Sequence, residues 1–146
     1  MKALLQRVKK ASVTIEGKIY SEIKQGILIF LGIEKNDSDS QAEFLASKIS
    51  NLRIFDDQDG KMNLSIKDIS GEILIVSQFT LASDCKKGTR PSFDNAKSPK
   101  EANAIYEKFI SFVKQNNISV KTGVFGAMMD IELINDGPVT FILTKE

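Results

Sequence analysis

Histidine and tryptophan are absent from this 146-residue sequence, and cysteine occurs once, at Cys85. Without histidine, the chain contains no Ser-His-Asp or Cys-His catalytic arrangement. A zinc site is not expected either, because one cysteine cannot replace the histidines that usually bind zinc. A single cysteine also excludes a disulfide within the chain, which is typical of a reducing compartment and predicts a cytoplasmic protein. An enzyme of this composition has to work without the most common general base.

Long apolar runs and nucleotide-binding motifs are absent as well. No run approaches the roughly 20 apolar residues that cross a bilayer, and the first residues lack the apolar stretch and cleavage site of a signal peptide. Neither G-x-x-x-x-G-K-[ST] nor G-x-G-x-x-G occurs. We therefore expect no membrane partner and no cofactor or metal.

The charges are almost balanced, with 20 basic and 19 acidic residues and a net charge of +1. Proteins that hold long duplexes by neutralising phosphates have a clear basic excess, so DNA binding is not expected. Any contact with nucleic acid has to come from a local patch, unless the basic residues form an ordinary solvated surface. Two clusters are candidates for such a patch: Lys2, Arg7, Lys9 and Lys10, and then Lys86, Lys87 and Arg90.

Alternation and capping signals predict a single domain over residues 1–146. Period-two alternation predicts strands at 12–16 and 19–23, and continuous apolar runs predict buried strands at 26–33 and 71–81. Capping-box spacing predicts helices that begin at Ser38 or Ser40 and at Ser98. Alternation returns at 129–133 and 139–143, with a turn at 135–138 between them. This order predicts an α+β fold, with a mostly antiparallel or mixed sheet or barrel-like β layers, and two helices packed on one face.

Three hydrogen-bonding side chains, Ser77, Gln78 and Thr80, stand where the predicted strand 71–81 ends. They either satisfy neighbouring backbone groups or form the floor of a polar pocket. In such a pocket, N–H groups freed at the strand end hold an oxyanion. Thr80 is a candidate nucleophile, but no base lies near it in the sequence to activate it.

Two more segments have both a structural and a functional interpretation. Residues 135–138, Asn-Asp-Gly-Pro, are typical of a hairpin turn, but a cis Gly137–Pro138 bond would present two carbonyls as a rigid acceptor pair. The segment GVFGAMM at 123–129 either fills the core or lines a pocket for a flat apolar ligand. Cys85 has no histidine to lower the pKa of its thiol, which argues against a reactive cysteine.

Several segments together resemble the D-aminoacyl-tRNA deacylase family. SQFTL at 77–81 and NDGPVT at 135–140 are similar to the two signature motifs of that family and stand at matching spacing. The likeness extends over LLQRV, LRIFDDQDGKMNLS, GTRPSFDNA and GVFGAMM, so it runs nearly from end to end. Two motifs in register are far more specific than either motif alone.

The resemblance implies a homodimer that hydrolyses the ester joining a D-amino acid, or glycine, to the 3′ acceptor end of tRNA. It implies that Ser77, Gln78, Phe79 and Thr80 line the catalytic pocket around the terminal adenosine. The ester is already activated and the tRNA supplies a neighbouring 2′-hydroxyl. Positioning and one oxyanion donor, such as the Phe79 N–H, would therefore be sufficient without histidine.

The same resemblance assigns chiral selection to a second group of residues. Gly137 and Pro138 of one subunit would enter the pocket of the other and leave no space for an L side chain, with Arg7 holding them in place. Phe125 and Met129 would line the substrate side of the pocket. Two other classes stay open on the residues alone: a non-catalytic nucleic-acid-binding module, and a hydrolase of small D-amino acid esters.

Overall fold

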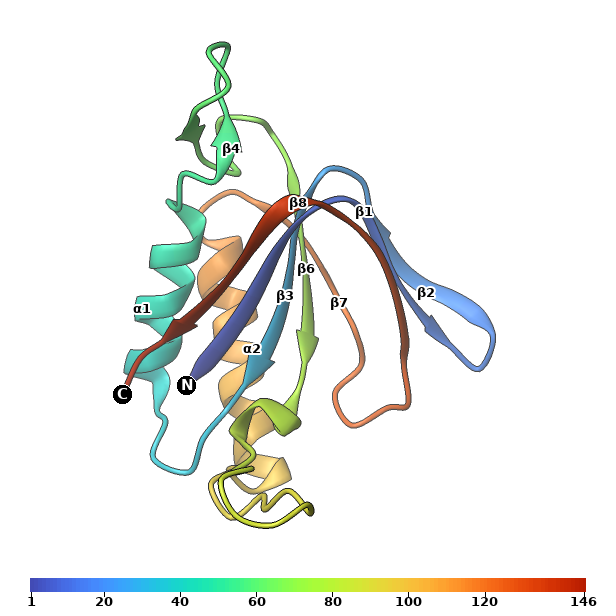
Figure 1. Cartoon of the computed structure of the whole chain (residues 1–146), viewed down its shortest axis with the longest axis vertical. Coiled ribbons are helices and arrows are strands. Elements are labelled where there is room, and N and C mark those ends of the chain that lie inside the picture. Colours follow the sequence, from blue (N-terminus) through green and yellow to red (C-terminus); the bar gives the residue numbers. More distant parts are fainter.

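A long, bent strand, β1 (Lys2–Ile15), organises the sheet of the computed structural model, which describes residues 1–146 (Figure 1). One edge of β1 pairs with β8 (Asp130–Thr144) along most of its length. The other edge pairs first with β3 (Gly26–Gly32) and then with β2 (Lys18–Ile23). All three pairings are antiparallel, and the bend of β1 curls this part of the sheet.

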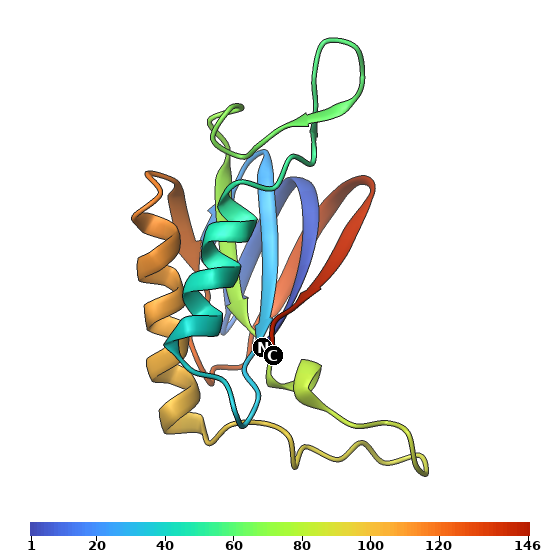
Figure 2. The same cartoon turned by 90° about the vertical axis from the view of Figure 1, so that its left-hand side faces the viewer.

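Two shorter strands complete a mixed sheet of six strands, because β6 (Glu72–Ser77) pairs parallel with β3 and β7 (Ser119–Thr122) pairs parallel with β6. Helices α1 (Asp39–Ser50) and α2 (Pro99–Lys114) lie side by side on one face of this sheet (Figure 2). The predicted α+β fold with a mixed sheet and two helices is therefore confirmed. Neither helix has the length and apolar composition needed to cross a bilayer.

Strand β3 is apolar on both faces because two separate clusters cover it. Ile27, Ile29 and Leu31 face the main core, which lies between the sheet and the two helices. Leu28 faces the opposite way, into a smaller cluster with residues of β1, β2 and β6. Full burial of one such side chain stabilises the fold by about 1.5–3 kcal/mol. The continuous apolar run at 26–33 is thus explained by burial on both sides.

The predicted strand 71–81 is too long. Strand β6 ends at Ser77, and the chain turns into a short 3₁₀-helix, η1 (Phe79–Ala82). The last backbone bond to β3 comes from the Gln78 N–H, which donates to Leu31 O at 2.8 Å. Polar side chains therefore stand at this point because the sheet ends there.

The predicted hairpin turn at 135–138 is wrong. Both flanking segments belong to β8 and pair with the same strand, β1. Between the partners Gln6–Thr140 and Val8–Asn135, β1 advances by two residues and β8 by five, so residues 136–139 form a bulge opposite Arg7. Alternation on both sides of a bulge resembles two strands joined by a turn, which is why the pattern was misleading.

A small hairpin projects from the end of the molecule that lies above α1 in Figures 1 and 2. It consists of β4 (Phe55–Asp56) and β5 (Met62–Leu64), which form a separate two-stranded sheet. Asp57 organises its tip by accepting hydrogen bonds from the Asn63 side chain at 2.7 Å and from the Lys61 N–H at 3.0 Å. These bonds, the Asn63 bond above all, lower the pKa of Asp57.

Asp37 is a buried carboxylate that holds the first residue to the start of α1. It accepts a hydrogen bond from the Met1 ammonium group at 2.6 Å and another from the Glu34 N–H at 2.6 Å. Asp37→Asn is expected to lower the free energy of unfolding by about 1.5–3 kcal/mol, the usual contribution of hydrogen bonds to a charged group. Chemical denaturation would measure this change.

Asp39→Asn is the matched control for this prediction. Asp39 lies two residues further on and pairs with Lys108, but both side chains are about half exposed. Exposed ion pairs contribute only about 0–1 kcal/mol. Equal losses of stability in the two variants would contradict the special role of Asp37.

Candidate functional site

A cleft of about 650 Å³ opens where the parallel strands β3 and β6 end. Sites at the carboxyl ends of parallel strands are common in sheets of this kind. The lining is mostly apolar and comes from three parts of the chain: the ends of β3 and β6, the segment 93–102 that leads into α2, and residues 125–131. Lys97 is the only charged residue in the lining, and its ammonium group donates to Lys35 O at 2.8 Å. The cleft therefore contains no carboxylate or imidazole that acts as a general base.

The end of β6 brings together the residues of the SQFTL motif. Ser77, Gln78 and Phe79 line the cleft, whereas Thr80 lies just outside the lining and is exposed. The Gln78 side chain donates from Nε2 to the Thr80 hydroxyl at 2.5 Å. This bond makes Thr80 a polar contact of Gln78, and no base contacts its hydroxyl.

The first residues of η1 present backbone donors at the cleft. A helix leaves its first N–H groups without partners inside the helix, so the N–H groups of Phe79 and Thr80 are free of intrahelical bonds. Gly32 accommodates this turn: a Cβ atom at residue 32 would lie 2.6 Å from the Leu81 Cβ and 3.1 Å from Gln78 O. The strand end thus presents free backbone N–H groups at the cleft, and their role as oxyanion donors stays a prediction.

Two exposed aromatic rings stand at the mouth of the cleft. Phe79 is 60% exposed and Phe93 is 40% exposed, and their ring centroids are 5.1 Å apart with planes tilted by 54°. Exposed aromatic pairs of this kind are suitable platforms for a nucleobase. Sequence reasoning missed Phe93, although it lies in the segment GTRPSFDNA that carries part of the family resemblance.

The opposite wall is formed by the segment 123–129. The Gly123 N–H donates to Ile75 O at 3.0 Å, and the Val124 N–H donates to the Met129 sulfur at 3.4 Å. Phe125 packs against the main core and also lines the cleft. Met129 packs against the smaller cluster and lines the cleft as well. Both interpretations of GVFGAMM, core filling and pocket lining, therefore apply to the same side chains.

Tyr106 of α2 links the end of β6 to the segment 123–129. Helical periodicity in the sequence predicts its burial but not these contacts. Its hydroxyl donates to Ile75 O at 2.8 Å, the same carbonyl that accepts the Gly123 N–H, and its ring lies 5.8 Å from that of Phe125. Burial, with a smaller contribution from Glu107, raises the pKa of Tyr106 far above its ordinary value. The phenol therefore stays protonated and acts as a fixed donor.

Gly137 and Pro138 lie on the bulge of β8, far from the cleft of their own chain. Both residues are exposed, and the peptide bond between them is cis. The bulge lies opposite Arg7, and the row of Arg7 in the sheet is four residues, or about 13 Å along the strands, from the row of Ser77. Across the sheet, β8 is the third strand from β6. The structure therefore does not bring the two motifs together within one chain.

Arg7 holds the bulge from beneath, and its side chain is almost completely buried. Its guanidinium donates to Asp136 O at 3.0 Å, and to Ile54 O at 2.7 Å at the base of the β4–β5 hairpin. The carboxylates of Asp136 and Asp56 each lie 3.3 Å from it. Asp136 directly precedes Gly137, so Arg7 contacts the residue next to the Gly–Pro bond. Its carboxylate and carbonyl partners were not predicted.

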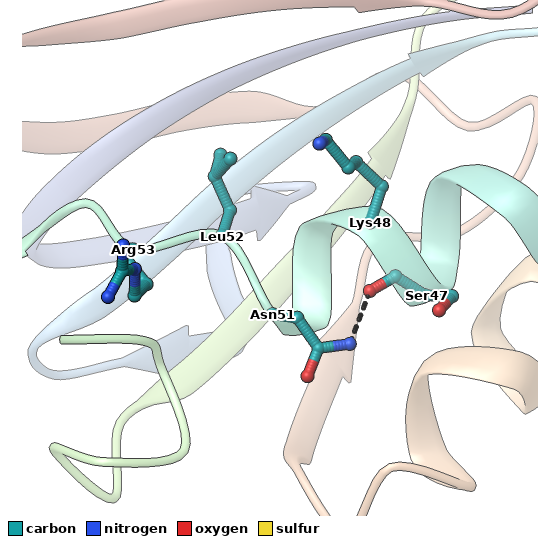
Figure 3. Close-up of a pocket in the computed structure, with 5 residues that line it drawn as sticks. All are labelled: Ser47, Lys48, Asn51, Leu52 and Arg53. Carbon is teal, nitrogen blue, oxygen red and sulfur yellow. Dashed lines mark hydrogen bonds between the residues drawn. The ribbon is translucent and has the colours of Figure 1, made fainter. Parts of the chain in front are cut away.

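A second hollow, of about 390 Å³, lies at the carboxyl end of α1 (Figure 3). Its lining is mainly polar, and Figure 3 shows Asn51 donating to the Ser47 carbonyl, a bond of 2.8 Å that closes the last turn of the helix. Lys48 and Arg53 point in different directions there. The hollow is therefore the surface of a helix end and contains no convergent functional groups.

Comparison with known proteins agrees with this geometry. A family model described as D-Tyr-tRNA(Tyr) deacylase matches residues 4–144. The D-aminoacyl-tRNA deacylase of Thermodesulfovibrio yellowstonii is 61% identical over 143 residues, covering 98% of both chains. The enzyme of the same name from Dictyoglomus turgidum is 53% identical, covering 100% of this chain and 94% of its own. The chain belongs to the D-Tyr-tRNA(Tyr) deacylase family.

Two solved structures share the fold. A c-Myc DNA unwinding element binding protein superposes with a TM-score of 0.94 at 41% identity, covering 100% of this chain and 99% of its own. A probable eukaryotic D-amino acid tRNA deacylase superposes with a TM-score of 0.85 at 15% identity, covering 97% of each chain, which supports the fold alone. The family predicted from the two motifs is confirmed, and so is the expectation of an enzyme that hydrolyses carboxylic esters.

Proposed function

We propose that this cytoplasmic enzyme hydrolyses the ester between a D-amino acid, or glycine, and the 3′-terminal adenosine of tRNA, and that it rejects L-aminoacyl esters. Water attacks the ester carbonyl carbon, and the resulting oxyanion accepts a hydrogen bond from the Phe79 N–H. The bond to the 3′ oxygen then breaks, and the proton released by the water passes through the 2′-hydroxyl to that oxygen. The products are the free amino acid and tRNA.

The observation that carries this proposal is a cleft with backbone donors but no acid or base. Its lining combines the start of η1 with apolar side chains, and its one charged group, Lys97, is already engaged. Such a site is suited to an ester that is already reactive and carries its own hydroxyl group. One well-placed oxyanion donor lowers the barrier by about 3–4 kcal/mol.

Chiral selection is assigned to the bulge of a second copy of the chain. Gly137 and Pro138 are exposed and distant from the cleft of their own chain, so they reach a cleft only in a partner subunit. Strand β8 is an edge of the sheet and exposes Ile134, Phe141 and Ile142, which supports burial of this face in a homodimer. A rigid main-chain obstacle excludes every L side chain alike, whereas apolar contacts discriminate by only about 1–3 kcal/mol.

Incubation with D-Tyr-tRNA, L-Tyr-tRNA and glycyl-tRNA tests the proposal directly. We expect release of free tRNA from the D and glycyl esters at rates at least about 1,000-fold above that of the L ester, a ratio beyond the roughly 10–200-fold of apolar contacts alone. D-Tyr methyl ester, which lacks the adenosine, should be a poor substrate. Equal hydrolysis of both Tyr-tRNA esters would contradict chiral selection, and efficient hydrolysis of the methyl ester would indicate a small-ester hydrolase.

Binding without turnover is the competing function, because one structural neighbour is named as a DNA-binding protein. Tight binding of nucleic acid without release of tRNA from either ester would favour that function.

A further inference from the structure

Residues 84–92 form a narrow projection, here called the basic finger, beside the mouth of the cleft. Its two limbs are joined by reciprocal backbone bonds between Asp84 and Ser92, at 2.8 and 2.9 Å. The Asp84 carboxylate accepts the Lys86 N–H at 2.8 Å, and Gly88 supplies a positive φ of 68° at the tip. The finger is therefore a built turn with a defined base.

The tip of the finger carries three basic side chains with no partner in the chain. Lys86, Lys87 and Arg90 are exposed, and their ammonium and guanidinium groups make no ion pair or hydrogen bond. Two other lysines near the cleft are engaged instead: Lys2 contacts Glu34 at 3.0 Å and Leu81 O at 3.1 Å, and Lys97 contacts Lys35 O. The finger thus presents free positive charge at this end of the molecule.

Both limbs of the finger continue into residues that line the cleft. The first limb follows η1, which begins with Phe79, and the second leads into Phe93. The contact between the two aromatic rings closes the finger's base at the cleft mouth. A nucleoside held against this aromatic pair would therefore have its adjoining phosphates beside the finger.

The distribution of charge favours the same orientation of an anionic ligand. The basic finger and the β4–β5 hairpin project from opposite ends of the molecule (Figure 2). The hairpin carries Asp56, Asp57 and Asp59 against one lysine, whereas the finger carries three basic residues against Asp84, so these two projections differ in sign while the net charge is only +1. A local electric field of this kind steers a polyanion toward the cleft and not toward the rest of the surface.

We infer that the basic finger binds the phosphodiester backbone of the single-stranded RNA end next to the nucleoside held in the cleft. The inference rests on the proposed function for the identity of that nucleoside. Each neutralised phosphate of a single strand contributes about −0.7 to the slope of log affinity against log salt concentration. Three basic side chains therefore correspond to a slope difference of about 2.

The test compares K86A/K87A/R90A with the wild type on D-Tyr-tRNA and on 3′-O-(D-tyrosyl)adenosine, which has no phosphate. We expect the KM for the tRNA to rise about tenfold or more near physiological salt, with a salt slope flatter by about 2 and an unchanged kcat. Hydrolysis of the adenosine ester should not change. A fluorescent RNA oligonucleotide ending in CCA provides a direct binding measurement by anisotropy.

The matched control, K48A/K61A/K67A, removes the same charge at the end of the molecule that carries α1's carboxyl terminus and the hairpin. It should leave both the KM and the salt slope unchanged. An unchanged salt slope in the finger variant overturns the inference. A loss of activity on both substrates, together with a change of oligomeric mass, also overturns it, because the finger would then lie at a subunit contact. Inactivity of the wild type on both esters refutes the proposed function instead. In that case the binding of the RNA oligonucleotide to the wild type and the finger variant still tests the inference.

Discussion

Deletion of Gly137 and Pro138 is expected to remove the preference for D-aminoacyl-tRNA over L-aminoacyl-tRNA. The bulge that carries them is held by Arg7 beneath and by the Asn135 side chain, which donates to Arg7 O at 2.9 Å and to Val139 O at 3.1 Å. Shortening the bulge removes the obstacle but retains the β1–β8 pairing on both sides. The ratio of kcat/KM for D over L esters should fall from at least about 1,000 to below about 200, since only apolar contacts would then discriminate.

Mixing two defective variants tests whether the bulge acts on a partner subunit. The deletion leaves the cleft intact, and Phe79→Pro, which removes the backbone donor, leaves the bulge intact. In a two-fold symmetric dimer, random exchange places about half of the intact clefts opposite an intact bulge, so the L-ester hydrolysis of the mixture should fall to about half of its value before exchange. An unchanged rate on the L ester after exchange, with both variants folded by thermal melting, would refute action across subunits.

Removal of the 2′-hydroxyl from the terminal adenosine is the second change with a large expected effect. No carboxylate or imidazole lines the cleft, and in the proposed mechanism the substrate's own hydroxyl moves the proton. A D-Tyr ester on a 2′-deoxyadenosine terminus should be hydrolysed about 10²–10⁴-fold more slowly, the usual contribution of a general acid–base group. Single-turnover kinetics would separate this loss from weaker binding.

Thr80→Val is the control for that mechanism. Thr80 only accepts the Gln78 Nε2 bond, so the variant should keep most of its turnover. A covalent acyl group trapped on Thr80, or an inactive but folded Thr80→Val protein, would make Thr80 the nucleophile. Equal rates on the deoxy and ribose esters would also contradict assistance by the substrate.

Local patterns predicted the elements of this fold better than their connections. The capping residues Ser38 and Ser98 and the apolar run at 26–33 identify α1, α2 and β3, because these signals depend on neighbours in sequence. The single strand β8 was mistaken for two, because a bulge preserves alternation on each side. Strand β7 was missed, because four residues carry too little periodicity.

Sequence reasoning identified only those residues of the candidate site that lie within a continuous motif of the chain. Ser77, Gln78 and Phe79 were found because they follow a buried strand and lie in a motif. Phe93 and Tyr106 come from distant segments and meet the site only through tertiary packing. Their roles depend on which carbonyl group or aromatic ring they contact in the folded chain, and residue spacing in the sequence does not specify these contacts.

The buried guanidinium of Arg7 has a consequence for the cell. It connects β1, the base of the hairpin and the bulge through one side chain, well away from the cleft at the ends of β3 and β6. Under the proposed function, hydrolysis and chiral selection therefore depend on separate parts of the fold. A substitution of Arg7 would then yield an enzyme that still hydrolyses D-aminoacyl-tRNA but no longer spares correctly charged tRNA.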